Sequence, residues 1–107
     1  MALIKGQKYS KKGVGFKKPE YSGATAIING EIYFFITLSG KYNNEWKNGR
    51  LIVDTSCSSH VVQHNTTPNK TVHVFVRNFP ISPFFEYIGD LDYMKPYDPN
   101  RNDWVLK

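Results

Sequence analysis

Apolar and polar positions alternate most regularly between Thr71 and Tyr93, in the run TVHVFVRNFPISPFFEYIGDLDY. Valines at 72, 74 and 76 occupy every second position, which gives a first strand two distinct faces. Two prolines within Asn78–Pro83 interrupt the pattern, because proline cannot donate to a ladder. Phe84–Ile88 is aromatic and β-branched, and Gly89-Asp90 is expected to end this second strand or to bulge it. The pattern predicts a hairpin in the middle of a sheet.

A second hairpin is predicted in the first half of the chain. Asn29-Gly30 is a typical type I′ turn dipeptide, and it separates a short strand at 24–28 from the apolar run EIYFFITL at 31–38. Asn48-Gly49 signals another turn at the end of a polar loop at 41–49. The apolar residues that follow predict a short strand over Arg50–Asp54.

The remaining segments carry weaker patterns. Residues 55–70 are polar, and Ser58 or Ser59 is expected to cap a single helical turn over His60–His64. Residues 95–102 hold two prolines and predict a loop, and residues 103–106 predict a last edge strand. The length of 107 residues favours a single domain, with a basic arm or loop at 1–20, a β core at 21–94 and a C-terminal loop and edge strand at 95–107.

Charge is distributed unevenly along the chain. The formal net charge is +5, which favours an anionic partner such as nucleic acid or anionic lipid. Six lysines and no acid lie between Lys5 and Lys18, whereas residues 86–103 hold five acids. The chain is therefore expected to present a basic face and an acidic face. The alternative for the lysine-rich segment is a solvated, frayed terminus.

Cysteine content and hydropathy indicate a cytoplasmic protein. Cys57 is the only cysteine, so an intramolecular disulfide is impossible, which fits a reducing compartment. Residues 1–12 lack the long apolar run of a signal peptide, and no apolar segment is long enough to span a membrane.

Candidate catalytic and metal chemistry is sparse. His60 and His64 are four residues apart, a spacing that suits a metal on a helix, and Cys57 and His73 are candidate further ligands. The set lacks a known zinc spacing, and the alternative is that the histidines are ordinary loop residues. Cys57 with His60 or His64 is a candidate nucleophile pair, but nothing in the sequence around Cys57 marks an oxyanion site. Cys57 is therefore expected to be a small buried residue. The carboxylates are scattered, and no phosphate loop is present. We expect no catalysis, no metal and no cofactor.

Nucleic-acid binding fits the polar and aromatic residues better. Backbone contacts are expected from four lysines and two arginines, Lys11, Lys12, Lys17, Lys18, Arg50 and Arg77. Tyr42 and Trp46 are expected to stack on a base or wedge a duplex, and the alternative is that Trp46 packs into the core beside Leu51. The polar side chains that can contact base edges in a groove are His60, Gln63, His64 and Asn65.

The central hairpin resembles DNA-recognition modules of bacterial restriction enzymes, which accompany HNH nucleases, phospholipase-D-type nucleases and helicases. Their hallmark is a strand like "hLFVR", a short linker and an aromatic strand ending in "YLG". The matching residues here are His73, Val74, Phe75, Val76 and Arg77, then Pro83, Phe84, Tyr87, Ile88 and Gly89. Upstream, YNNEWKNGRLIVDTS is similar to the segment that precedes this hairpin in the HNH-linked members, and the resemblance covers about residues 42–94.

The resemblance implies a small, twisted PUA-like or SRA-like pseudo-barrel of about five to seven strands with one short helix. It also implies recognition of double-stranded DNA, in some relatives DNA with modified cytosine, for a nuclease or helicase. The Asn-Arg-Thr-like run of the relatives is here only Asn65-Thr66-Thr67. The chain is expected to be an excised recognition domain, a stand-alone reader, or a phage or plasmid protein that uses the fold differently.

These observations favour a non-catalytic DNA-binding recognition module of a restriction or defence system. The alternative is a protein-interaction module, such as an inhibitor or accessory subunit in a phage or defence system, whose acidic C-terminal half contacts a basic partner. A small enzyme is a third hypothesis.

Overall fold

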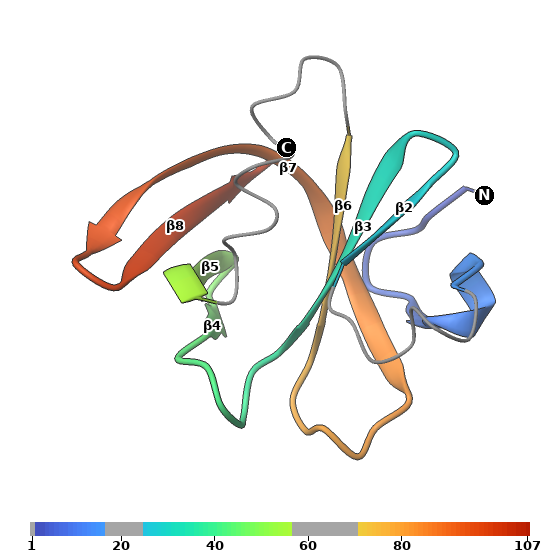
Figure 1. Cartoon of the computed structure of the whole chain (residues 1–107), viewed down its shortest axis with the longest axis horizontal. Coiled ribbons are helices and arrows are strands. Elements are labelled where there is room, and N and C mark those ends of the chain that lie inside the picture. The colour runs from blue at the N-terminus through green and yellow to red at the C-terminus, as the bar shows by residue number, and fades with distance from the viewer. Residues whose placement is uncertain (1, 17–24, 57–70) are drawn as a thin grey trace.

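The computed structural model describes residues 2–16, 25–56 and 71–107, and these residues form a mainly β fold (Figure 1). A single 3-10 turn, η1, spans Lys12–Val14. The strands within these ranges are β1 Lys8–Ser10, β2 Thr25–Ile28, β3 Glu31–Thr37, β4 Glu45–Lys47, β5 Arg50–Asp54, β6 Val72–Arg77, β7 Phe84–Asp98 and β8 Arg101–Leu106.

The strands form a curled sheet in which β7 belongs to two limbs. The order is β2-β3-β6-β7-β8-β5-β4, and β1 joins β7 off this path. The first limb consists of β1, β2, β3, β6 and the N-terminal part of β7. The second limb consists of the C-terminal part of β7 with β8, β5 and β4. Figure 1 shows β7 arching from one limb to the other, so that the sheet curls around the space between them. This confirms the predicted mainly β fold with a small, twisted, barrel-like sheet, although the described residues contribute eight strands and five to seven were expected.

A bulge allows β7 to continue past Gly89. Val74 pairs with Gly89 but Phe75 pairs with Tyr87, so Ile88 is the extra residue on β7. Gly89 has a φ of +131°, a conformation that residues with a side chain rarely adopt. The predicted bulge is therefore confirmed, and the strand runs on to Asp98 instead of ending here.

The three predicted turns and hairpins are present. Strands β6 and β7 pair antiparallel between β3 and β8, which confirms the central hairpin. Asn29 and Gly30 have φ values of 51° and 79°, as a type I′ turn requires, and join β2 to β3. Asn48 and Gly49 have φ values of 56° and 74° and join β4 to β5.

The first limb is buried on both faces. Strands β3 and β6 pair in parallel, an arrangement found almost only where both faces of a sheet are covered. The inner cluster contains residues of both limbs and consists of Ile32, Phe34, Ile36, Leu51, Val53, Val72, Val74, Val76, Ile88, Leu91 and Trp104. The outer cluster lies under β1 and η1 and consists of Val14, Phe16, Tyr33, Phe35, Phe75, Phe85 and Tyr87. Stacking of Trp104 on Phe34, with ring centroids 5.0 Å apart, joins the two limbs.

Three local predictions were wrong. Residues 95–102 are not a loop, because β7 extends to Asp98 and a turn at 99–100 leads directly into β8. Strand β8 is not an edge strand, since it lies between β7 and β5 and buries Trp104. The polar segment at 41–49 contains the short strand β4, which the turn at Asn48 folds onto β5. In each case the segment becomes a strand because it pairs with a neighbouring strand, and its own composition does not predict this pairing.

The described part of the basic arm is packed on the sheet. Lys8 pairs with Glu86 across β1 and β7, and the side chains of Val14 and Phe16 are buried. Tyr9 packs edge-to-face on Phe75, with centroids 6.0 Å apart. The backbone of this segment is therefore held against the sheet. No helix within the described ranges has the length and apolar character needed to cross a membrane.

Candidate nucleic-acid interface

Arg77, the last residue of β6, is the centre of a basic pocket on the first limb. Its guanidinium lies 4.4 Å from the centroid of the Phe85 ring. Nε donates to Thr37 Oγ1 at 2.8 Å, and Nη1 donates to the carbonyl oxygen of Ser82 at 2.6 Å. Both acceptors are neutral, and no carboxylate among the described residues forms an ion pair with Arg77. The positive charge is therefore fixed in position without being neutralised by these contacts.

Two lysines approach the same place from η1 and the residue before it. Nζ of Lys11 lies 5.8 Å from the centroid of the Phe85 ring and 5.9 Å from that of Phe35. Burial lowers the pKa of Lys11, and the charge of Arg77 lowers it further. Burial likewise lowers the pKa of Arg77. Burial is thus the main cause of both shifts, and the nearby charge of Arg77 contributes only to that of Lys11.

The resulting Arg77 pocket has a volume of about 240 Å³. It is lined by Ser10, Lys11, Lys12, Arg77, Pro83 and Phe85. Among the described residues, the lining contains three basic side chains, one hydroxyl group and one aromatic ring, and no carboxylate. Phosphate oxygens suit such a lining, because each basic group can donate to them.

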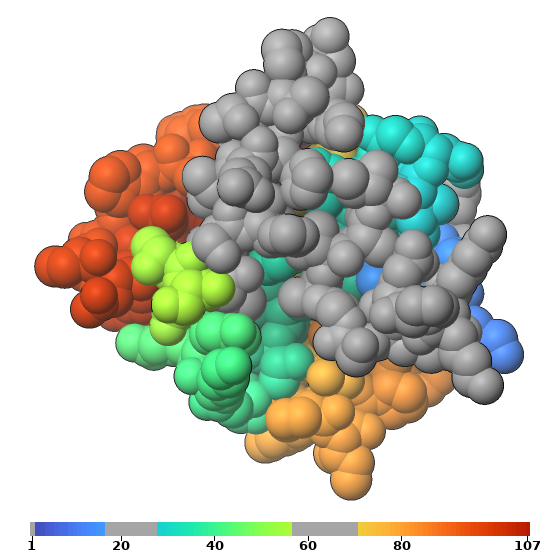
Figure 2. Space-filling view, in the orientation of Figure 1, coloured from blue at the N-terminus to red at the C-terminus, as the bar shows by residue number. Residues whose placement is uncertain are grey.

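A second hollow, the Trp46 groove, adjoins the Arg77 pocket. Its volume is about 320 Å³, and Arg77 lines both. The other lining residues are Lys8, Leu38, Trp46, Val76, Asn78, Phe79, Ser82, Phe84 and Glu86. The groove therefore combines aromatic surface with charges of both signs. In Figure 2 the β6–β7 connection, in orange, lies at the rim of the molecule beside the green segment that follows β3.

The two aromatic candidates have different positions. Trp46 lies opposite Leu51 in the β4–β5 hairpin and is partly buried against the inner cluster. Trp46 also lines the Trp46 groove, so it has both a packing role and a surface that faces a hollow. Tyr42 is half-buried, and Nζ of Lys41 lies 5.3 Å from its ring centroid. Tyr42 lines neither hollow described above.

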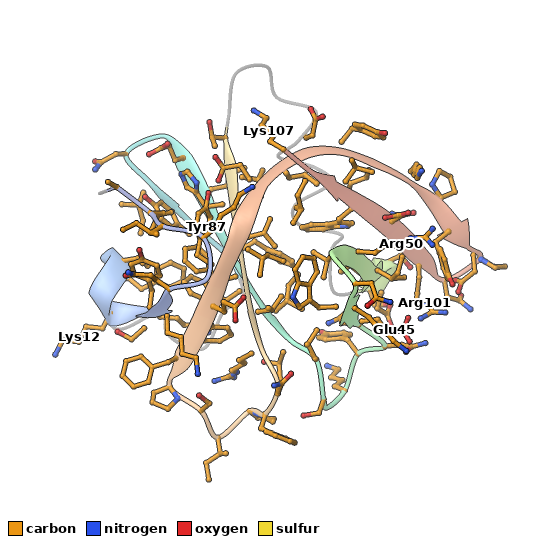
Figure 3. The ribbon with its side chains drawn as sticks, turned by 180° about the vertical axis from the view of Figure 1, so that it is seen from behind. Lys12, Glu45, Arg50, Tyr87, Arg101 and Lys107 are labelled. Carbon is orange, nitrogen blue, oxygen red and sulfur yellow. The ribbon has the colours of Figure 1, made fainter. Side chains whose placement is uncertain are left out.

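Arg50 does not line the Arg77 pocket, and its expected contact with nucleic acid stays a prediction. Its guanidinium pairs with Asp103 at 2.9 Å and lies 5.1 Å from the Tyr97 ring centroid. The physical reason is that Arg50 begins β5 on the second limb. Figure 3 shows Arg50 and Lys12 on opposite sides of the molecule. Its charge is already neutralised in place by a buried carboxylate.

The other predicted contacts lie outside the described residues. They are Lys17, Lys18, His60, His64 and Asn65, together with Cys57 and the expected helical turn. These predictions stay predictions. Within the described part of the chain, no group of three His, Cys, Asp or Glu side chains is arranged to hold a metal.

His73 forms a buried polar cluster that sequence reasoning did not find. Its Nδ1 lies 2.6 Å from Asp90 Oδ1, and its Nε2 lies 3.1 Å from Glu31 Oε1. The hydroxyl group of Tyr87 donates to the same Asp90 oxygen at 2.5 Å. The ring of Tyr33 is 4.8 Å from that of His73. Because each carboxylate contacts a different ring nitrogen, the cluster ties together β3, β6 and β7.

Sequence reasoning also missed Ser10, Pro83 and Phe85 as parts of the Arg77 pocket. Phe85 offered no separate signal, because its aromatic character is equally typical of a buried strand. Ser10 comes to the pocket only through the pairing of β1 with β7.

No family model, curated protein or solved structure matches the chain. The resemblance of the central hairpin to restriction-enzyme recognition modules therefore stays a prediction.

Proposed function

We propose that the protein is a non-catalytic module that binds double-stranded DNA by holding backbone phosphates at the Arg77 pocket. The observation that carries the proposal is the arrangement of Lys11, Lys12 and Arg77 around one pocket, to which the described part of the chain contributes no carboxylate. Phosphate contacts supply most of the affinity of sequence-independent DNA binding.

Arg77 is preorganised for such a contact. Its bonds to Thr37 and Ser82 use Nε and Nη1 and fix the plane of the guanidinium. Nη2 forms no hydrogen bond with the described residues, and arginine carries five N–H donors in total. A phosphate that enters the pocket therefore meets a donor that needs little reordering, which lowers the entropic cost of binding.

The more specific function that we propose, here called the finer role, is the recognition of modified or flipped bases in the bound DNA. This recognition would serve a restriction or defence system, with a nuclease or helicase as the partner or a further domain. Two observations support this extension. The central hairpin resembles such recognition modules, and the adjoining Trp46 groove offers aromatic surface next to the phosphate contacts. A base outside the stack would gain stacking energy there.

Fluorescence anisotropy with labelled duplexes tests the proposal. Lys12 is exposed, so Lys12→Ala leaves the fold intact and removes one phosphate contact. We expect a loss of about 1 kcal/mol, which is about fivefold in affinity, for methylated and unmethylated duplexes alike. Lys95→Ala is the matched control, because Lys95 is also exposed but lies on the second limb.

Equal affinities of wild type, Lys12→Ala and Lys95→Ala would contradict the assignment of phosphate contacts to the Arg77 pocket. Absence of binding at 50 mM salt would contradict DNA binding altogether. A preference of the wild type for methylated over unmethylated duplex would support the finer role.

The alternative of a protein-interaction module finds less support in the charges. It depended on an acidic C-terminal half, but three of the five carboxylates between residues 86 and 103 are engaged within the chain. Asp98 pairs with Arg101 at 2.8 Å, and Asp103 pairs with Arg50 at 2.9 Å. Asp90 contacts His73. Glu86 and Asp92, which form no ion pair with the described residues, are the two acids of this region that remain for a basic partner.

A further inference from the structure

The connection between β6 and β7 exposes apolar side chains at its tip. The Phe79 side chain is 63% exposed and that of Ile81 is 91% exposed. Both belong to the segment NFPISP at 78–83, which projects at one end of the first limb in Figure 1. Exposed apolar side chains that lie together mark contact sites for a partner.

The tip is held in place at both ends. The carbonyl oxygen of Asn78 accepts hydrogen bonds from Ser39, one of them from the backbone N–H at 3.0 Å. The backbone N–H of Ser82 donates to the carbonyl oxygen of Phe79 at 3.2 Å, which closes a turn. Arg77 fixes the far side through the Ser82 carbonyl oxygen. Pro80 lies inside this turn and restricts its backbone further. The apolar side chains are therefore presented on a preorganised support.

Basic side chains line both hollows that reach this tip. Lys11 and Lys12 line the Arg77 pocket, which reaches Pro83. Lys8 lines the Trp46 groove, which reaches Phe79 and also contains Glu86. Arg77 lines both hollows. An apolar projection with cations beside it is complementary to a partner whose apolar interior is flanked by anions.

We propose that Phe79 and Ile81 form a wedge that enters between base pairs of the bound duplex and unstacks one step. This inference rests on the proposed function. Base pairs form the apolar interior of a duplex, and the two phosphate backbones are the flanking anions. Apolar side chains that enter between base steps kink the duplex, and cations beside them hold the backbone. The wedge is thus assigned to the β6–β7 tip instead of to Tyr42 and Trp46, which are partly buried.

A mismatch tests the wedge, because a mismatched pair is already partly unstacked and costs less to open. The experiment compares two labelled duplexes of the same length, one fully paired and one with a single central mismatch. We expect the wild type to bind the mismatched duplex about tenfold more tightly, a difference of about 1.4 kcal/mol. The double variant Phe79→Ser, Ile81→Ser should bind both duplexes equally and keep its dependence on salt. Tyr93→Ser is the matched control, since it removes an exposed aromatic side chain from the second limb.

The possible results separate the wedge from the proposed function. Equal, salt-dependent binding of both duplexes by the wild type would overturn the wedge and leave DNA binding in place. A mismatch preference that survives in the double variant would also overturn the wedge. Absence of binding to either duplex would overturn both. Binding to anionic phospholipid vesicles that needs Phe79 and Ile81, without any mismatch preference, would assign the tip to a membrane surface and overturn the wedge. Unchanged circular dichroism of the double variant shows that its fold is intact.

Discussion

Replacement of His73 by alanine is expected to be among the most destabilising changes outside the apolar core. The residue is 9% exposed and connects two carboxylates from different strands. Among the described residues, its removal leaves Asp90 with one side-chain partner, Tyr87, and leaves Glu31 with none. A buried acceptor that loses its donor keeps the full cost of desolvation.

The magnitude follows from the exposure of each carboxylate. The Asp90 side chain is 27% exposed, and a hydrogen bond to a charged group in such a place contributes about 1.5–3 kcal/mol. The Glu31 side chain is 46% exposed, so solvent screening limits its contact to at most about 1 kcal/mol. We expect His73→Ala to lower the free energy of unfolding by about 3 kcal/mol, which corresponds to about 12 °C in Tm for a chain of this size.

Urea denaturation followed by tryptophan fluorescence measures this loss, and double-mutant cycles divide it between the two carboxylates. The first cycle combines His73→Ala with Asp90→Asn, and the second combines His73→Ala with Glu31→Gln. The coupling energy of His73 with Asp90 should be at least about twice that with Glu31, because Asp90 is less exposed and its contact is shorter.

Two outcomes would refute this reasoning. A loss below about 1 kcal/mol for His73→Ala would show that the cluster does not hold the strands together. A larger coupling with Glu31 than with Asp90 would show that exposure does not govern the strength of these contacts. Lys95→Ala, an exposed change on the second limb, should stay within about 0.5 kcal/mol of the wild type.

Three further predictions concern the scaffold. Burial and the contact with Asp90 raise the pKa of Tyr87, and burial raises the pKa of Tyr33. The stability that these two neutral tyrosines contribute is therefore fully present below about pH 10 and falls as pH rises above it. Tyr87→Phe should make this alkaline loss of stability shallower in pH-dependent thermal melts. The indole N–H of Trp104 has no hydrogen-bond partner in the described part of the chain. In urea denaturation, Trp104→Phe should therefore lower the free energy of unfolding by less than about 1.5 kcal/mol, and Trp104→Ala by about 3–5 kcal/mol. Equal losses for the two variants would contradict this prediction. Gly89→Ala should lower the free energy of unfolding by about 1–3 kcal/mol, because alanine rarely adopts the φ of +131° and its Cβ would lie 3.1 Å from Lys5 Cε. An unchanged midpoint of urea denaturation would contradict this prediction.

Local sequence signals predicted the elements whose cause is local. The valine alternation at 72–76 predicts β6, and Asn29-Gly30 predicts the β2–β3 turn, because each depends on the residues themselves. The parallel pairing of β3 with β6 has no such signal, since the partners are separated by about 40 residues in the sequence. Strand β4 and the start of β8 are polar, and only pairing with a neighbour makes them strands.

The same distinction applies to the candidate site. Lys11 and Lys12 were predictable as cations, but their meeting with Arg77 depends on the pairing of β1 with β7. Arg50 was equally basic in the sequence, yet the fold places it against Asp103 on the other limb. Charge can be counted from the sequence, whereas its pairing or exposure depends on long-range contacts.

The salt dependence of duplex binding tests the central proposal most directly. If Lys11, Lys12 and Arg77 each neutralise one phosphate, the logarithm of the association constant should fall with the logarithm of salt concentration with a slope of about −2.7. The slope should become shallower by about 0.9 in Lys12→Ala and stay unchanged in Lys95→Ala. A wild-type slope near zero, or no measurable binding at 50 mM salt, would contradict the assignment of the Arg77 pocket to backbone phosphates.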